Sequence, residues 1–187
     1  MDIKQDVFDE IGIDISDFNK QTVEDLRGEL FWKHAFYTNK GSKKWPGLIF
    51  LPFISLQASI GTSNKIDYNK PFSVSSGNNG HSSVGFTTGI ILDFVETIEI
   101  GTTLGYTNFF KRDISDMRVP TNQFQSAIYP FTTSTSVNPG SNYFFEGHLS
   151  AYHFLDKLSA WVQYVYTHHD RDTIQLQQTD SAFDTTT

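Results

Sequence analysis

The chain has 187 residues, which is long enough for one domain with a core. Its net charge of −7 argues against binding to phosphate groups or nucleic acid, and the absence of cysteine excludes disulfides, thiolate metal sites and a cysteine nucleophile. Aromatic residues make up 15% of the chain although its mean hydropathy is −0.33, so large rings are mixed with small polar residues. Such mixing is typical of a β-sheet with one apolar face and one wet face.

Residues 1–27 are predicted to form an N-terminal loop or a plug-like segment. They open with the acidic stretch MDIKQDVFDE, which lacks the basic and apolar start of a secretory signal, so we expect any export signal to lie outside this chain. Two weak elements are expected nearby, a short candidate strand over 10–18 and a helix that begins at about Thr22.

The first pair of strands is predicted at 28–38 and 47–60, joined by the polar connection NKGSKKWP. Apolar residues of the second strand alternate along the chain and share one face: Leu48, Phe50, Ile54, Leu56, Ala58 and Ile60. Pro52 interrupts this strand. Because proline has no N–H group to donate to a neighbouring strand, it predicts a bulge or an edge.

Two further hairpins show the clearest alternation. Residues 82–94 and 98–110 form one of them, with only 95–97 between the strands, and residues 143–154 and 158–170 form the other, with a turn at 155–157. One face of each strand is rich in Ile, Leu, Val and Phe, and the other is rich in Gly, Ser, Thr, Gln and Glu. Each strand is therefore expected to separate an apolar environment from a wet one.

The connections alternate between short and long. The short ones are 39–46, 95–97 and 155–157, and the long ones are 61–81, 111–141 and 171–187. A transmembrane β-barrel places short turns at one rim and long loops at the other, and predicted strands of about 10–13 residues match the roughly 9–11 tilted residues that cross a bilayer. No run reaches the roughly 20 apolar residues of a membrane helix.

The stretches FVETIEIGTTLGYTNFF (94–110) and FLDKLSAWVQYVY (154–166) each join an apolar residue, a short acidic turn and an outgoing strand with aromatic ends. In these the chain resembles bacterial outer-membrane β-barrels of the porin-like kind. The resemblance implies an all-β fold, an antiparallel up-and-down transmembrane β-barrel in the bacterial outer membrane. Its hairpins would occupy 28–170, with lipid outside, aromatic girdles at both interfaces and a polar lumen inside.

Two features differ from that pattern. The chain ends SAFDTTT, whereas such barrels usually end on a strand with a terminal aromatic residue, and six strands are predicted where the smallest closed barrels have about eight. We therefore expect a partial barrel in which 171–187 is a C-terminal loop that is cut short. The alternative is that two more strands lie at 10–18 and 172–178.

The polar faces of these strands predict the lining of a lumen. The residues assigned to it are Ser55, Gln57, Asp93, Glu99, Thr103, Glu146, His148, Ser150 and Gln163. Asp93 and Glu99 flank one short turn, where they either favour cations or simply make the mouth polar. Glu146 and His148 lie two apart on one strand, so they share a face, and a hydrogen bond between them is favoured over a metal site.

The long segment 111–141 begins with the charged residues Lys111, Arg112, Asp113, Asp116 and Arg118. It resembles the porin loop that folds into the lumen and narrows it. Two alternatives stay open for this segment, an external lid and a surface β-extension formed by FQSAIYPFTTSTSV (124–137).

A cluster of His168, His169, Asp170 and Asp172 lies where the last strong strand meets its loop. Outer-membrane proteases resemble this arrangement in using His and Asp at the extracellular rim to activate water. Adjacent histidines on a strand point to opposite faces, however, so they cannot serve one site without a bulge. A polar strand end in solvent is the favoured interpretation.

The function predicted from these features is a passive channel for small solutes, which is not an enzyme and needs no cofactor or metal. Its expected partners are outer-membrane lipid and small solutes, without nucleic acid, and assembly into a homo-oligomer is left open. One alternative is a structural or adhesin barrel whose external loops bind a partner. Another is a soluble β-sandwich or lectin-like binding module whose apolar face is a core. A hydrolase at the rim comes last.

Overall fold

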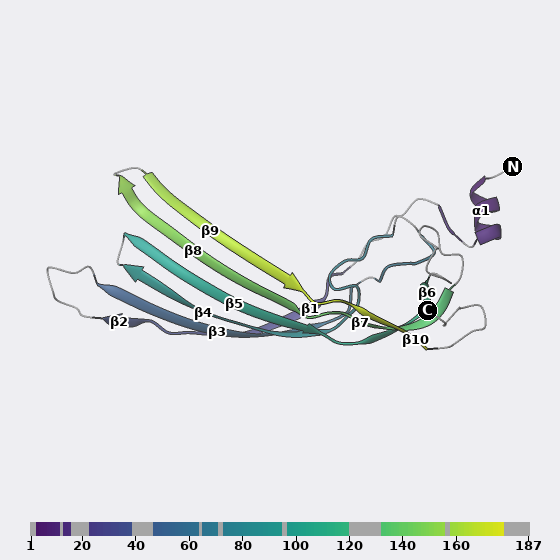
Figure 1. Ribbon diagram of the computed structural model, residues 1–187, viewed down its shortest axis with the longest axis horizontal. Helices are drawn as coiled ribbons and strands as arrows, with labels where there is room; N and C mark the ends of the chain where they lie inside the picture. Colours follow the sequence, from purple (N-terminus) through teal and green to yellow (C-terminus); the bar gives the residue numbers. More distant parts are fainter. Residues whose placement is uncertain are drawn as a thin grey trace.

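The computed structural model describes residues 3–11, 13–15, 23–38, 47–63, 65–70, 73–94, 97–119, 132–155 and 158–177. Most of them belong to one long antiparallel sheet of seven strands, whose long strands lie side by side in chain order (Figure 1). Along the sheet the strands are β1 (Leu26–Lys33), β3 (Leu48–Ile60), β4 (Ser83–Phe94), β5 (Ile98–Phe109), β8 (Asn142–Leu155) and β9 (Leu158–His169), with β2 (Phe36–Thr38) beside β3. The fold is therefore all-β and antiparallel, and each strong predicted strand coincides with a strand of this sheet.

Proline explains why the predicted strand 28–38 is broken into β1 and β2. The last pair of β1 is Lys33↔Phe53 and the first pair of β2 is Phe36↔Phe50, so the gap lies opposite Pro52. The carbonyl of Pro52 accepts a hydrogen bond from the backbone N–H of His34 at 3.2 Å. In an antiparallel ladder the N–H and C=O of one residue point to the same neighbour, so the missing N–H of Pro52 also faces this strand and interrupts its pairing.

A second, three-stranded antiparallel sheet continues the first beyond its long-loop end. It has the order β10-β7-β6, with β6 at Arg112–Arg118, β7 at Thr132–Asn138 and β10 at Thr173–Leu176. In the chain β6 follows β5, β7 precedes β8 and β10 follows β9, so each short strand extends a long one (Figure 1). We call this sheet the extension.

The extension corrects the prediction of one long irregular loop over 111–141. Its strands β6 and β7 pair as a hairpin with a bulge between Ile114 and Met117, which agrees with the alternative of a surface β-extension. Residues 120–131 lie outside the described residues. The candidate strand at 172–178 is present as β10, although it pairs with β7 and does not widen the main sheet.

The N-terminal block differs from its prediction. A helix, α1, occupies Ile3–Ile11, so the candidate strand over 10–18 is wrong at its start, and its last residues, 16–18, lie outside the described residues. The helix expected from about Thr22 is also wrong, because 23–25 are not helical and Leu26 already pairs with Ile60 of β3. Pairing along a whole strand outweighs the weak helix propensity of that stretch. Within the described part of the chain, no helix has the length and hydropathy required to span a membrane.

Burial in the main sheet is the reverse of that in a soluble protein. Ile13 and Val119 are the buried apolar residues of the described chain, and neither lies in the main sheet. Large apolar side chains on one face are exposed, such as Leu56 at 55% and Leu104 at 52%. Ser55 on the opposite face is only 3% exposed. Soluble domains bury Leu and expose Ser, so this sheet does not build a conventional core.

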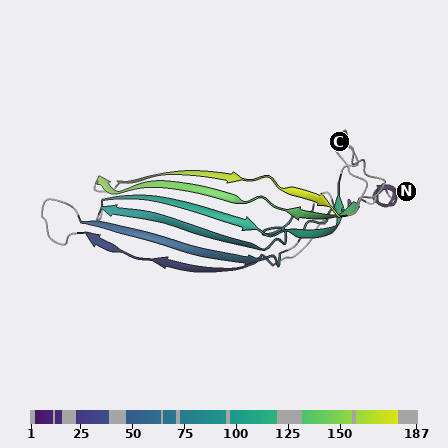
Figure 2. The same ribbon diagram turned by 60° about the horizontal axis from the view of Figure 1, so that its bottom comes forward.

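The polar face is the concave one. A single cavity is lined by Arg27 and Glu29 of β1 and also by Asn142 of β8, although β3, β4 and β5 separate these strands. The sheet must therefore curl to bring β1 and β8 around the same space, and both views show it as a curved trough (Figures 1 and 2). The described strands do not close into a barrel, and the two edge strands, β1 and β9, are exposed along their whole length.

Candidate functional site

All residues predicted to line a lumen lie on the concave face. The register places Asp93, Glu99 and Ser150 in one row across the sheet, and Thr103 beside Glu146 in another. His148 and Gln163 pair directly, and Ser55 and Gln57 lie on the same face of β3, opposite Thr87 and Gly85. Period-two alternation and antiparallel register are enough to bring these side chains to one surface.

A cluster of ionisable groups, which we call the histidine cluster, lies on this face near the short turns. Nε2 of His148 lies 3.1 Å from Oε1 of Glu99, and Nδ1 of His148 lies 3.7 Å from Oε1 of Glu146. The shorter contact therefore joins His148 of β8 to Glu99 of β5. The expected hydrogen bond between His148 and Glu146 within β8 is not formed, because the imidazole lies over the neighbouring strand β5. Across the described residues, no group of three or more His, Asp or Glu side chains is arranged to hold a metal ion.

Glycines on the central strands make room for these rings. A Cβ atom at Gly101 would lie 2.0 Å from Cε1 of His148, and one at Gly105 would lie 1.8 Å from Cε1 of Phe144. A side chain at either position would therefore displace the ring that covers it. The glycines let large side chains lie flat against the wall of the trough.

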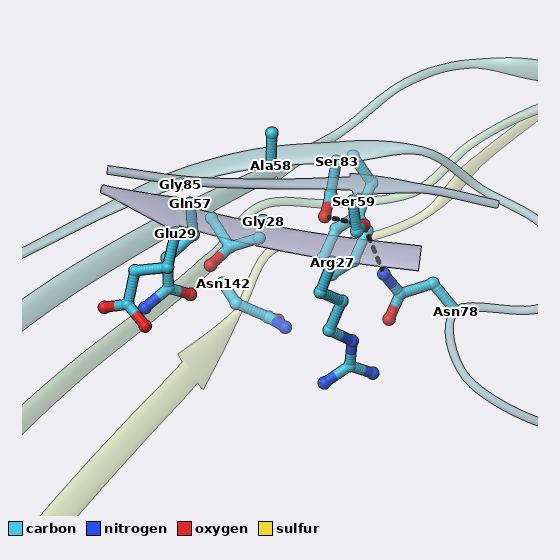
Figure 3. A pocket seen from close by; sticks show the side chains of 12 residues that line it. Arg27, Gly28, Glu29, Gln57, Ala58, Ser59, Asn78, Ser83, Gly85 and Asn142 are labelled. Atoms are coloured by element: carbon cyan, nitrogen blue, oxygen red, sulfur yellow. Dashed lines mark hydrogen bonds between the residues drawn. The ribbon is translucent and has the colours of Figure 1, made fainter. Parts of the chain in front are cut away.

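The cavity lies at the long-loop end of the trough and has a volume of about 480 Å³ (Figure 3). That size is within the range of small-molecule sites. Side chains from five strands and one loop line it, and most are polar: Arg27, Gly28, Glu29, Gln57, Ala58, Ser59, Asn78, Ser83, Gly85, Thr107, Phe109 and Asn142.

The floor of this cavity is hydrogen-bonded within itself. The hydroxyls of Ser59 and Ser83, both buried, are 2.7 Å apart, and the Asn78 side-chain amide donates to the Ser59 hydroxyl at 3.2 Å (Figure 3). Buried hydroxyls need such partners, since an unsatisfied one costs about 1–3 kcal/mol. The polar groups of the floor thus satisfy one another. The polar groups that remain available to a solute are the side chains above the floor.

Asp25, which sequence reasoning did not single out, attaches the 61–81 segment to the start of β1. Its buried carboxylate accepts hydrogen bonds from the backbone N–H groups of Ser63 at 3.1 Å and Asn78 at 2.6 Å. Burial acts to raise the pKa of Asp25. The Ser63 hydroxyl, these two N–H groups and the nearby charge of Arg27 outweigh that effect and leave the pKa below its ordinary value. Gly77, with a φ of +58°, lets the loop pass close to the carboxylate.

The histidines at the rim do not share a site. His168 pairs with Tyr143 and His169 pairs with Asn142, so they lie on opposite faces of β9, as the alternation predicts. Nδ1 of His169 contacts the side-chain oxygen of Asn142 at 2.5 Å, and its Nε2 contacts Asp172 at 2.9 Å. A general base needs one ring nitrogen open to its substrate, and both are already engaged.

Asp172 completes this connection at the rim by accepting a hydrogen bond from the backbone N–H of Gly140 at 2.9 Å. The Gly140 N–H and the contact with His169 keep the pKa of Asp172 below its ordinary value, against the effect of burial. His169 and Asp172 thus hold the ends of β8 and β9 together where they pass into the extension. We assign them a structural role.

The charged residues predicted to form a constriction lie on or beside β6, in the extension. The Arg112 guanidinium donates to the backbone carbonyl of Asn79 at 2.8 Å, and Asp113 accepts from the Ser136 hydroxyl at 2.7 Å. These contacts attach the 65–80 segment to β6 and join β6 to β7. The contacts described for Arg112 and Asp113 do not reach the histidine cluster. The constriction role of these charged residues therefore stays a prediction.

Sequence reasoning missed Arg27, Glu29 and Asn142 as members of the concave face. The signal was present, because 26–29 alternates charged residues with apolar or small ones. Arg27 lies one residue before the predicted strand 28–38, whereas Glu29 lies inside it. Asn142 lies at the first position of β8, where a boundary placed one residue late left it in a loop. The sequence matches no protein-family model and no curated protein, so the interpretation of this face depends on its own geometry.

Proposed function

We propose that this sheet is a section of the wall of a bacterial outer-membrane β-barrel, and that its concave face lines a channel for small polar solutes. The observation that carries the proposal is the reversed burial of the two faces. Apolar side chains such as Ile54, Leu56 and Leu104 are exposed on the convex face, while serines are buried on the concave face. A bilayer outside and water inside would satisfy both faces.

Aromatic rings on the convex face support this orientation. Phe86, Tyr106, Tyr143 and His168 form one row across four strands, with successive ring centroids 5.9, 5.0 and 6.2 Å apart. The row lies near the long-loop end of the strands, where a membrane barrel carries an aromatic girdle at the interface with water.

A soluble sandwich would need a second layer over the apolar face. In the described part of the chain that face has no such cover, and the extension continues the sheet lengthwise. Large exposed apolar surfaces mark membrane or protein contacts. In hydrocarbon the edges β1 and β9 also require pairing, so we infer that further strands complete the wall on both sides.

Passage through such a channel needs no reaction. Solutes would diffuse along a wet wall, and selection would come from the bore and from the lining charges. Asp93, Glu99 and Glu146 give the concave face near the short turns a negative character. A mild preference for cations follows from it.

Thiol scanning tests the proposal, because the chain has no cysteine of its own. Thr103→Cys and Leu104→Cys place single thiols on opposite faces of β5, at adjacent positions. In protein refolded into lipid vesicles we expect a water-soluble maleimide to label the first and not the second. The fluorescence of a bimane attached to the thiol of the Leu104→Cys variant should be quenched by spin-labelled lipid. Equal labelling of both thiols and no quenching would contradict a membrane wall.

The extension supports a second candidate function, an outer-membrane protein that binds a partner with its external surface. A cavity of about 340 Å³ lies where the extension meets the 65–81 segment, with His81, Ile114, Met117 and Ile174 among its lining residues. A correct thiol pattern together with zero conductance in planar bilayers would favour this function over a channel.

A further inference from the structure

The cavity of Figure 3 contains two opposite charges that do not neutralise each other. Arg27 and Glu29 lie two residues apart on β1, so both point to the concave face, with their Cα atoms about 6–7 Å apart. No ion pair within 4.0 Å joins them. Their backbones pair with Ser59 and Gln57 of β3, but neither side chain forms a hydrogen bond with another described residue. Figure 3 shows both side chains extending from β1 toward the cavity, with the ends directed apart.

The groups around these charges can bind neutral polar atoms. Gln57 pairs with Glu29 across β1 and β3, and its carboxamide offers both donors and an acceptor. Gly85, opposite Gln57, adds no side chain beside the hydrogen-bonded floor of Ser59 and Ser83. The cavity thus presents a cation at one end, an anion at the other and an amide beside them.

We propose that this cavity is a binding subsite for a small zwitterion of about dipeptide size. An extended dipeptide spans about 7 Å, which matches the spacing along β1. Its carboxylate would bind the Arg27 guanidinium, its ammonium would bind the Glu29 carboxylate, and its peptide group would meet Gln57. The inference rests on the proposed function, in which the concave face is the wet one.

The test is calorimetric titration of the chain refolded in detergent micelles with Ala-Ala, N-acetyl-Ala-Ala and Ala-Ala amide. The expected result is that each blocked peptide binds about tenfold more weakly than Ala-Ala, because each loses one charge-assisted contact. Arg27→Gln and Glu29→Gln should each weaken Ala-Ala binding by a similar factor. The matched controls are Lys33→Gln, which changes a charge on the same face outside the cavity, and Glu24→Gln, which removes an exposed negative charge just before β1.

The pairing of variants with peptides is the decisive readout. Glu29→Gln should leave the affinity for N-acetyl-Ala-Ala unchanged, since that peptide has no ammonium, and Arg27→Gln should leave the affinity for Ala-Ala amide unchanged. Equal binding of all three peptides, no binding of Ala-Ala, or an equal loss in the controls would overturn the subsite.

The titration does not depend on conduction, so its failure is distinguishable from failure of the proposed function. If Ala-Ala does not bind but the maleimide labels only the Thr103→Cys variant, the subsite is wrong and the membrane wall stands. If Ala-Ala binds through both charges but the maleimide labels both thiols equally, the subsite stands and the proposal of a membrane wall is wrong.

Discussion

The imidazole of His148 lies directly over Gly101 on the neighbouring strand, so that a Cβ atom at position 101 would be 2.0 Å from its Cε1. From this position the ring reaches Glu99 of β5, with Nε2 and Oε1 3.1 Å apart. A residue without a side chain thus determines where the imidazole of the histidine cluster lies. The same relationship recurs between Gly105 and Phe144, and between Gly89 and Phe53.

Replacing Gly101 with valine should therefore displace His148 and break its contact with Glu99. Overpacking of this kind costs about 1–3 kcal/mol, and we expect a lower urea midpoint for the chain in micelles. Gly147→Ala is the matched control, because the nearest atom to its Cβ would be 3.7 Å away. Equal stability of the two variants would show that His148 does not need this space.

Neutralising the carboxylates near the short turns should reduce the proposed preference for cations. In planar bilayers Glu99→Gln and Asp93→Asn are each expected to lower the ratio of cation to anion permeability, because each removes a negative charge from the lining. Glu24→Gln, just before β1, removes the same charge outside the main sheet and should change the ratio less. An unchanged ratio in all three variants would exclude this part of the face from the ion path.

Asp25→Asn should loosen the 61–81 segment at neutral pH. The carboxylate binds two backbone N–H groups while ionised, and losing hydrogen bonds to a buried charged group costs about 1.5–3 kcal/mol. We expect faster amide exchange at Ser63 and Asn78 than in the parent chain.

The pH dependence of that difference follows from the direction of the shift. The pKa of Asp25 is lower in the folded chain than in the unfolded one, so its stabilisation is present above the unfolded pKa of about 3.9 and is lost as pH falls through the folded pKa. Parent and variant should therefore converge in strongly acidic buffer. A difference as large there as at pH 7 would exclude ionisation of Asp25 as its cause.

The two rim histidines should respond differently to substitution. His169→Ala removes contacts with both Asn142 and Asp172, and we expect a loss of about 0.5–1 kcal/mol, small because these side chains are exposed. His168→Ala, on the opposite face, should change the unfolding free energy less. Amide exchange at Gly140 provides a local readout, since its N–H binds Asp172. Faster exchange in the His168 variant alone would contradict this assignment.

Much of the main sheet was predictable, because residues close together in the chain specify its strands and turns. Alternation with a period of two reports which residues share a face, and the short turns at 95–97 and 155–157 bring consecutive strands side by side. The residues assigned to the polar face, from Ser55 to Gln163, therefore lie together as expected. The charged start of β6 and the hydroxyl-rich β7 have no such apolar face, so alternation alone does not distinguish their pairing from a constriction or a lid.

The sequence by itself determined the long strands of the main sheet, their faces and the apolar character of one face, because alternation is a property of neighbouring residues. Only the tertiary structure decided that the polar face is concave, that Arg27 and Asn142 border one cavity, and that His148 lies over Gly101. These relationships join residues on strands that are distant in the chain. They depend on the curl of the sheet and on the space left by glycines, which no local pattern specifies.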